Sequence, residues 1–134
     1  MTTLSDAVDA QMPATLPLGG PLRVYERGAV PVSPGYPYGV YAAILGRAEG
    51  YSLTGVHGIR YGSVIVQTFG NTFAGADAVM TAITGALLDT PLAFDGYATD
   101  PLQFNLEPAV TQDPDDSGVI GITAAFTFAA QKES

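Results

Sequence analysis

The residues of this sequence best suited to chemistry are a single histidine and two groups of acids. His57 lies in a glycine-rich stretch, and no Ser or Asp pattern around it indicates a catalytic triad. A histidine that acts as a general base also needs a nucleophile and a partner that orients its ring, so a lone histidine does not make a catalytic site. We therefore expect His57 to have a structural or incidental role.

The first group of acids, Asp113, Asp115 and Asp116, could ligate calcium through carboxylate oxygens. An EF-hand loop alternates its ligands and ends on a glutamate at its twelfth position. Here Pro114 interrupts the run, and the twelfth position is Ala124. We interpret this segment as a solvated turn between two strands and expect no metal site.

The second group of acids, Asp95, Asp100 and Glu107, is separated by five and seven residues across a proline, so its members are not expected to meet. No glycine-rich motif has the lysine or the following helix that phosphate binding needs. The sequence thus predicts no catalytic residue, cofactor or metal, and we expect the chain not to be an enzyme.

Two segments have helical spacing. Leu4, Val8 and Met12 recur every four residues, which predicts a short helix over residues 3–12 with Thr3 or Ser5 as its cap. A proline- and glycine-rich linker follows at 13–21. The main helix is predicted where apolar residues recur at intervals of three and four: Phe73, Ala76, Met80, Ile83 and Leu87, between a cap at Asn71 or Thr72 and a stop at 89–91.

The remaining elements are strands, predicted at residues 22–26, 38–45, 61–69, 102–107 and 120–128. Strand 38–45 is apolar on both faces, which is typical of a strand buried on both sides. Residues 46–58 are expected to form a hairpin tip. We predict an α+β fold in which an antiparallel or mixed β-sheet packs against one main helix, with a core over 22–130 and a loose tail at 131–134.

Composition points to protein contacts. The chain has 134 residues, enough for one domain, with 47% hydrophobic and only 13% charged residues. Few charges remain to cover its surface, so we expect exposed apolar patches of the kind that bind other proteins. The net charge of −8 argues against direct nucleic-acid binding. The N-terminus shows no signal peptide and no apolar run is long enough to span a membrane, so we expect an intracellular chain with no membrane span.

Candidate interface residues follow from the scarcity of cations and the apolar last strand. Five Lys and Arg face 13 acids, so Arg47 and Arg60 are expected to pair with the acids of a neighbour. The loop at 28–37 is a further candidate, and the last strand supplies the apolar residues Ile120, Ile122, Phe126 and Phe128. The tyrosines of the first half are expected in the core and at interfaces.

The order of these motifs resembles the tail terminator, or tail completion, proteins of long-tailed bacteriophages. The resemblance rests on the strand Arg23–Glu26, the loop ending in Pro37-Tyr38-Gly39-Val40-Tyr41, the strand Ser63–Phe69 leading into an Ala-rich helix, and the turn Asp113–Gly118 before a long closing strand. It spans residues 4–130. The chain departs from the family pattern in Ser63–Gln67, where a charge is often found.

The resemblance implies a virion protein, made in the host cytoplasm, that forms a ring of six copies at the head–tail junction. Such a ring would sit on the last ring of tail tube protein, stop its polymerisation and present a surface to the head connector. DNA would pass through the lumen without specific binding. Two alternatives stay open: a head-completion adaptor or tail-tube-like subunit, and, from another class, a small ligand-binding module that uses the tyrosines.

Overall fold

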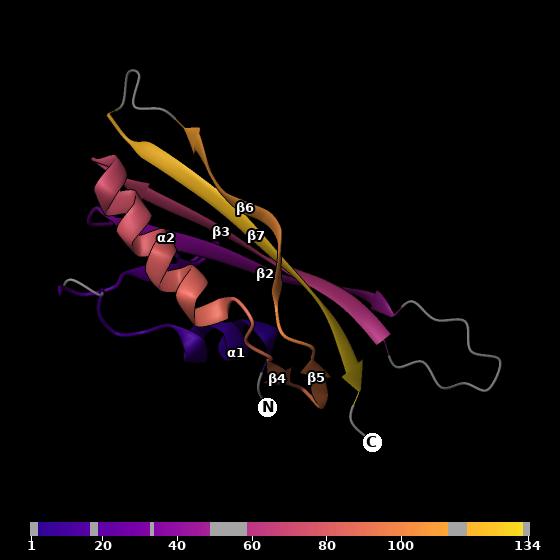
Figure 1. Cartoon of the computed structure of the whole chain (residues 1–134). Helices are drawn as coiled ribbons and strands as arrows, with labels where there is room; N and C mark the ends of the chain where they lie inside the picture. Colours follow the sequence, from indigo (N-terminus) through magenta and orange to yellow (C-terminus); the bar gives the residue numbers. More distant parts are fainter. Residues whose placement is uncertain (1–2, 17–18, 33, 49–58, 113–117, 133–134) are drawn as a thin grey trace, which may run out of the picture.

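The computed structural model describes residues 3–16, 19–32, 34–48, 59–112 and 118–132. The fold is α+β, as predicted, with two helices on one side of a strongly twisted sheet (Figure 1). Its elements, in chain order, are α1 (Leu4–Gln11), β1 (Val24–Glu26), β2 (Tyr38–Ala48), β3 (Ile59–Gly70), α2 (Phe73–Leu87), β4 (Ala93–Phe94), β5 (Tyr97–Thr99), β6 (Gln103–Gln112) and β7 (Ile120–Lys132).

The seven strands form one mixed sheet. Its order is β1-β2-β3-β7-β5-β4, and β6 also pairs with β7. β1 runs parallel to β2, and every other pair is antiparallel. β3 and β7 pair without a shift, from Ile59 opposite Gln131 to Gly70 opposite Ile120. This central ladder fixes which side chains point to each face of the sheet.

Both predicted helices are confirmed, and their first turns show why they begin where they do. Thr3 caps α1 and forms a capping box with Asp6, in which each side chain accepts a hydrogen bond from the other residue's backbone N–H. Thr72 caps α2 by accepting a hydrogen bond from the Gly75 N–H. Side-chain oxygens thus satisfy amides that a helix leaves unpaired at its start.

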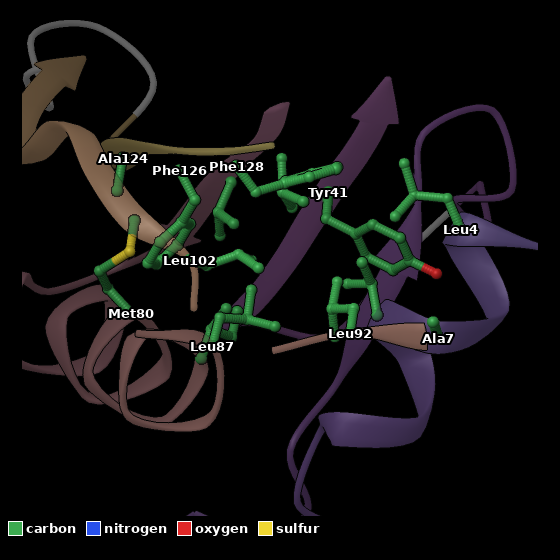
Figure 2. Close-up of a cluster of buried hydrophobic side chains, with 14 of the residues drawn as sticks. Leu4, Ala7, Tyr41, Met80, Leu87, Leu92, Leu102, Ala124, Phe126 and Phe128 are labelled. Atoms are coloured by element: carbon green, nitrogen blue, oxygen red, sulfur yellow. The ribbon is translucent and has the colours of Figure 1, made fainter. Parts of the chain in front are cut away.

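The core lies between the helices and one face of the sheet (Figure 2). Phe126 of β7 and Met80 and Leu87 of α2 are almost completely buried in it. α1 adds Leu4, Ala7 and Val8 to the same cluster. The core is therefore closed by both helices, and the prediction of one main helix understates the contribution of α1.

The sequence prediction missed one hairpin. β4 and β5 are joined by a tight turn in which Asp95 and Gly96 have φ values of 46° and 80°. Strands of two and three residues are too short for an alternation of side chains to be visible in the sequence. Several predicted features lie outside the described residues: most of the 46–58 tip with His57, the acids of 113–116, and residues 133–134 of the predicted tail. The prediction of a loose tail at 131–134 is wrong at Gln131 and Lys132, which belong to β7 and pair with β3 and β5.

Gly62 allows the sheet and the core to meet closely. It lies opposite Phe128, and a Cβ on Gly62 would overlap the Phe128 ring. Gly85 of α2 is the opposite case, because nothing lies within 4 Å of the position of its missing Cβ.

We expect Gly62→Ala to lower the free energy of unfolding by about 1–3 kcal/mol, since the ring must move within a packed core. The matched control, Gly85→Ala, should raise it by up to about 1 kcal/mol through helix propensity. Urea denaturation of both variants measures the two effects. Equal effects of the same sign would contradict this account of Gly62.

Tyr41 of β2 holds α1 against the sheet. Its hydroxyl donates a hydrogen bond to the Ser5 carbonyl at 3.2 Å, and only 2% of the residue is exposed. Burial raises the pKa of Tyr41 to about 12, and the carboxylates of Asp9, Glu26 and Asp6 add to the effect. The neutral phenol is therefore the form that the folded chain favours.

This raised pKa predicts a loss of stability in alkali. Unfolded Tyr41 ionises near pH 10, whereas folded Tyr41 keeps its proton until about pH 12. The unfolded state thus binds fewer protons in this window, and the free energy of unfolding should fall as the pH rises through it. The free energy of unfolding of Tyr41→Phe, measured by urea denaturation, should fall less steeply between about pH 10 and 12. Identical pH profiles for the two proteins would argue against this role.

Candidate interaction surface

The two faces of the sheet differ sharply in exposure. In β3 the even-numbered Val64, Val66 and Thr68 are completely buried, whereas the odd-numbered Tyr61 and Ile65 on the opposite side are 52% and 36% exposed. Side chains alternate along a strand, so the pairing of β2, β3 and β7 extends this contrast across the sheet. In the part of the chain that the structure describes, no helix covers the second side, which we call the outer face (Figure 1).

The outer face carries large apolar side chains without cover. Ile44 of β2 is 53% exposed and Leu106 of β6 is 45% exposed, in addition to Tyr61 and Ile65 of β3. Ile65 lies opposite Ala42 on one side and Ala125 on the other. Leu106 also pairs with Ala125 and thereby extends the apolar area to β6. Such a surface is typical of protein contacts.

The outer face is also uncharged. On its described residues in β2, β3 and β7, the polar side chains are hydroxyls and amides such as those of Ser63, Gln67 and Thr127. The chain as a whole has 13 Asp and Glu against 5 Lys and Arg. Acids are thus kept away from the middle of this face, where a buried carboxylate would be costly.

The predicted burial of β2 on both sides is wrong for the single chain. Tyr41 faces the core and is buried, but Ile44 on the other side is exposed. The pattern nevertheless has a physical meaning. β2 is apolar on both faces, but one of these faces is exposed in the single chain. Such an exposed apolar face is suited to contact with another protein.

Leu106 reaches the outer face because β6 shifts its register. Phe104 pairs with Phe126 and stacks on its ring at 5.0 Å between centroids, on the core side. Leu106 pairs with Ala125 after the shift, so it points to the other side of the sheet. In the sequence, Leu102, Phe104 and Leu106 alternate with polar residues, which predicts one half-buried face for all three, and this prediction is wrong at Leu106.

Aromatic rings gather at one end of the outer face. Tyr38 contacts Tyr36, Phe69 and Tyr25 at 5.5, 5.3 and 6.2 Å between ring centroids. Burial raises the pKa of Tyr38, with a smaller contribution from Tyr36. Tyr36 is 43% exposed, so the cluster offers a partly open aromatic surface suited to contact with protein.

An open groove of about 760 Å³ lies at the other end, beside Ile59, Ala98 and Ala129. The Asp100 carboxylate in its wall accepts a hydrogen bond from the Ala129 N–H at 2.9 Å. Asp100 is thereby engaged in joining the β5 segment to β7. In the described parts of the chain, no three His, Cys, Asp or Glu residues are grouped to hold a metal ion.

The structure places the predicted interface residues in different settings. Ile122, Phe126 and Phe128 are 2%, 0% and 3% exposed, so they belong to the core of the single chain rather than its surface. Ile120 is half-buried against that core. The apolar residues that are exposed for contact with another chain lie on other strands, on the opposite face of the sheet. The alternation of side chains along the strand around Ile65 is the sequence pattern that could have identified them.

Arg60 makes contacts within its own chain. Its Nε donates a hydrogen bond to the Gly46 carbonyl at 2.8 Å, and its guanidinium carbon lies 5.7 Å from the centre of the Tyr97 ring. The side chain of Arg47 is outside the described residues. In the predicted loop 28–37, Val30 is 37% exposed and Val32 is fully exposed.

We expect Ile44→Asp to weaken assembly of the chain, because it places a carboxylate in the apolar outer face. Phe73→Asp is a matched control, since Phe73 is also 53% exposed but lies in the first turn of α2. Both variants should remain folded by circular dichroism. Sedimentation or native mass at equal concentration should show a smaller assembly for Ile44→Asp alone. Loss of assembly in both would mean that the outer face has no special role.

Comparisons with known proteins show where this fold occurs. No protein-family model matches the chain, and no curated protein matches it. A chain from the virion of a native gene transfer agent particle matches with a TM-score of 0.71 and 21% identity, over 96% of this chain and 94% of that one. A second solved structure matches with a TM-score of 0.60 and 15% identity, over 98% and 89%. These likenesses establish a shared fold over nearly the whole chain.

Within the described ranges, no helix has both the length and the apolar character needed to cross a membrane.

Proposed function

We propose that this chain is a non-enzymatic structural subunit of a tailed virion, which forms a ring on the end of the tail tube. The observation that carries the proposal is the uncovered, uncharged outer face around Ile44, Tyr61 and Ile65. A soluble monomer has no use for such a face on an otherwise acidic chain. The shared fold with a virion chain supports the same assignment.

In this proposal the mechanism is geometric. Copies of the chain close into a ring of six, and the ring docks on the last ring of tube protein. The surfaces to which further tube subunits would add are then occupied, so polymerisation ends. The opposite side of the ring presents a surface to the head connector. A head-to-tail contact relates each copy to the next by a fixed rotation. The copies close into a ring when this rotation is a whole fraction of a full turn.

The charge of the chain fits a DNA conduit. The net charge of −8 repels phosphates, so DNA moving through the ring does not adhere to it. The described acids lie on α1 and α2, on turns and on the short or outer strands, as Asp77, Asp95 and Glu107 illustrate. The apolar outer face is left free for protein contacts, with the neighbouring copy and the tube protein as its partners.

The decisive experiment deletes this gene alone from the virus-like element that encodes it and images the particles by electron microscopy. We expect filled heads beside free tails of uncontrolled length. Free tails of normal, uniform length would move the protein to the head side of the joint, as an adaptor. Intact, functional particles would refute a role in joining or termination.

Native mass tests the remaining alternative, a small ligand-binding module. Six copies of the 13.8 kDa chain weigh about 83 kDa, whereas a binding module is expected to be a monomer or dimer. The measurement is best made with and without tube protein, because a ring can require its target to close.

A further inference from the structure

One edge of the sheet is left open in the single chain. β1 pairs only with Gly39–Tyr41 at the start of β2. No other strand in the described parts of the chain pairs with the same side of β2, so its continuation from Ala42 to Ala48 is an open edge. An open edge presents a row of backbone donors and acceptors, whose natural ligand is another extended strand.

The direction of the backbone groups along this edge follows from the hydrogen bonds to the β1 segment. The Gly39 N–H donates to the Arg23 carbonyl, and the Arg27 N–H donates to the Tyr41 carbonyl, both at 2.8 Å. Groups of alternate residues point to the same side of a strand. Those of Ala43 and Leu45 therefore point away from β3, toward the open side.

The side chains at this edge also favour an added strand. Ala43 and Leu45 are partly buried against the core, and Ile44 lies on the outer face between them. A strand added beside β2 would thus extend the core on one side and the apolar outer face on the other. Both effects bury apolar surface, and the backbone pairing supplies hydrogen bonds.

The β2 edge differs from the other edges in its lack of protection. Natural sheets protect edges by shortness, proline, charge and bulges. β1 and β4 have three and two residues. β6 is protected only in part: Glu107 and Pro108 lie at its middle and its register shifts against β7, but residues 103–106 and 109–112 have no charge and no proline. A register shift and Arg47 follow Leu45 in β2. Residues 42–45 before them have no charge, no proline and no shift, which indicates a stretch of edge that is meant to be paired.

The length and direction of β6 make it the partner strand. Among the edges described, β1 and β4 are too short to cover the open part of β2, whereas β6 has ten residues. β6 also leaves Leu106 and Val110 45% and 46% exposed. The alternation of strand directions through β3 and β7 makes β6 antiparallel to β2. If neighbouring copies are related by rotation about an axis parallel to the strands, each strand has the same direction in every copy. β2 of one copy and β6 of the next then meet antiparallel.

We propose that the open edge of β2, residues 42–46, pairs with the β6 edge of a second copy of this chain, so that the sheet continues from one copy to the next. The inference rests on the proposed function, because it supplies the lateral contact of the ring. The two edges lie on opposite sides of the β3–β7 pair (Figure 1). A head-to-tail contact between unlike edges is the kind that closes rings of more than two members.

Cross-linking tests this pairing cleanly, because the chain has no cysteine of its own. Ile44→Cys and Leu106→Cys each place a thiol on the exposed outer face beside one of the two edges. We expect a mixture of the two single variants to yield a covalent dimer with a short bismaleimide, and neither variant alone to do so. Phe73→Cys, with the same exposure as Ile44, is the control and should cross-link with neither.

Three results would overturn the pairing. Cross-linking of Ile44→Cys with itself would mean a two-fold contact between β2 edges. Assembly of the full native mass without a cross-link between the mixed variants would place the lateral contact elsewhere, yet it would leave the proposed ring intact. Persistence of a monomer at all concentrations, with and without tube protein, would also overturn the pairing of β2 with β6. The gene deletion experiment judges the proposed function independently of these outcomes.

Discussion

The unbroken pairing of β3 with β7 determines the rest of this structure. From Ile59 to Gly70, every residue of β3 has a partner in β7, with no bulge to change the register. A slip of one residue would send Val64 and Val66 to water and bring Ile65 into the core. Because these valines are completely buried under α2, the packing of the helix and the register of the ladder enforce each other.

That register divides the apolar residues between two faces, and only one is covered. The core face receives α1 and α2, while the outer face keeps Ile44, Tyr61 and Ile65 partly in water. Extra carboxylates on the outer face would have solved the solubility problem at no cost to the fold. The chain instead places its acids elsewhere and keeps this face neutral. Selection for a contact explains this distribution, whereas selection for a stable monomer does not.

The sequence predicted the elements whose signal is long and local. α2 shows an apolar stripe over four turns that begins after Thr72, and β7 shows alternation over residues 120–128. The faces were harder to predict. Ile122 and Phe126 were chosen as interface residues because they are apolar, but only the positions of α1 and α2 decide that their side is the core. Alternation separates two faces without telling which of them a helix covers.

The features that escaped prediction depend on contacts distant in sequence. The shift that sends Leu106 to the outer face arises from its pairing with Ala125, and the parallel pairing of β1 with β2 crosses a loop of eleven residues. The role of Gly62 depends on the Phe128 ring, 66 positions away. Composition had nonetheless indicated the exposed apolar surface, because too few charges exist to cover a domain of this size.

The open β2 edge and the outer face meet at Ile44, and their combination has consequences for assembly. A pairing of about five residues is weak by itself, since short two-stranded units are marginal in water. In a closed ring each copy makes this contact twice, and the last contact to form is intramolecular. A template that gathers the copies, such as the end of a tube, adds to the same effect. Like charges on an acidic chain also oppose such weak contacts, so the proposed ring would form more readily on a template than in free solution.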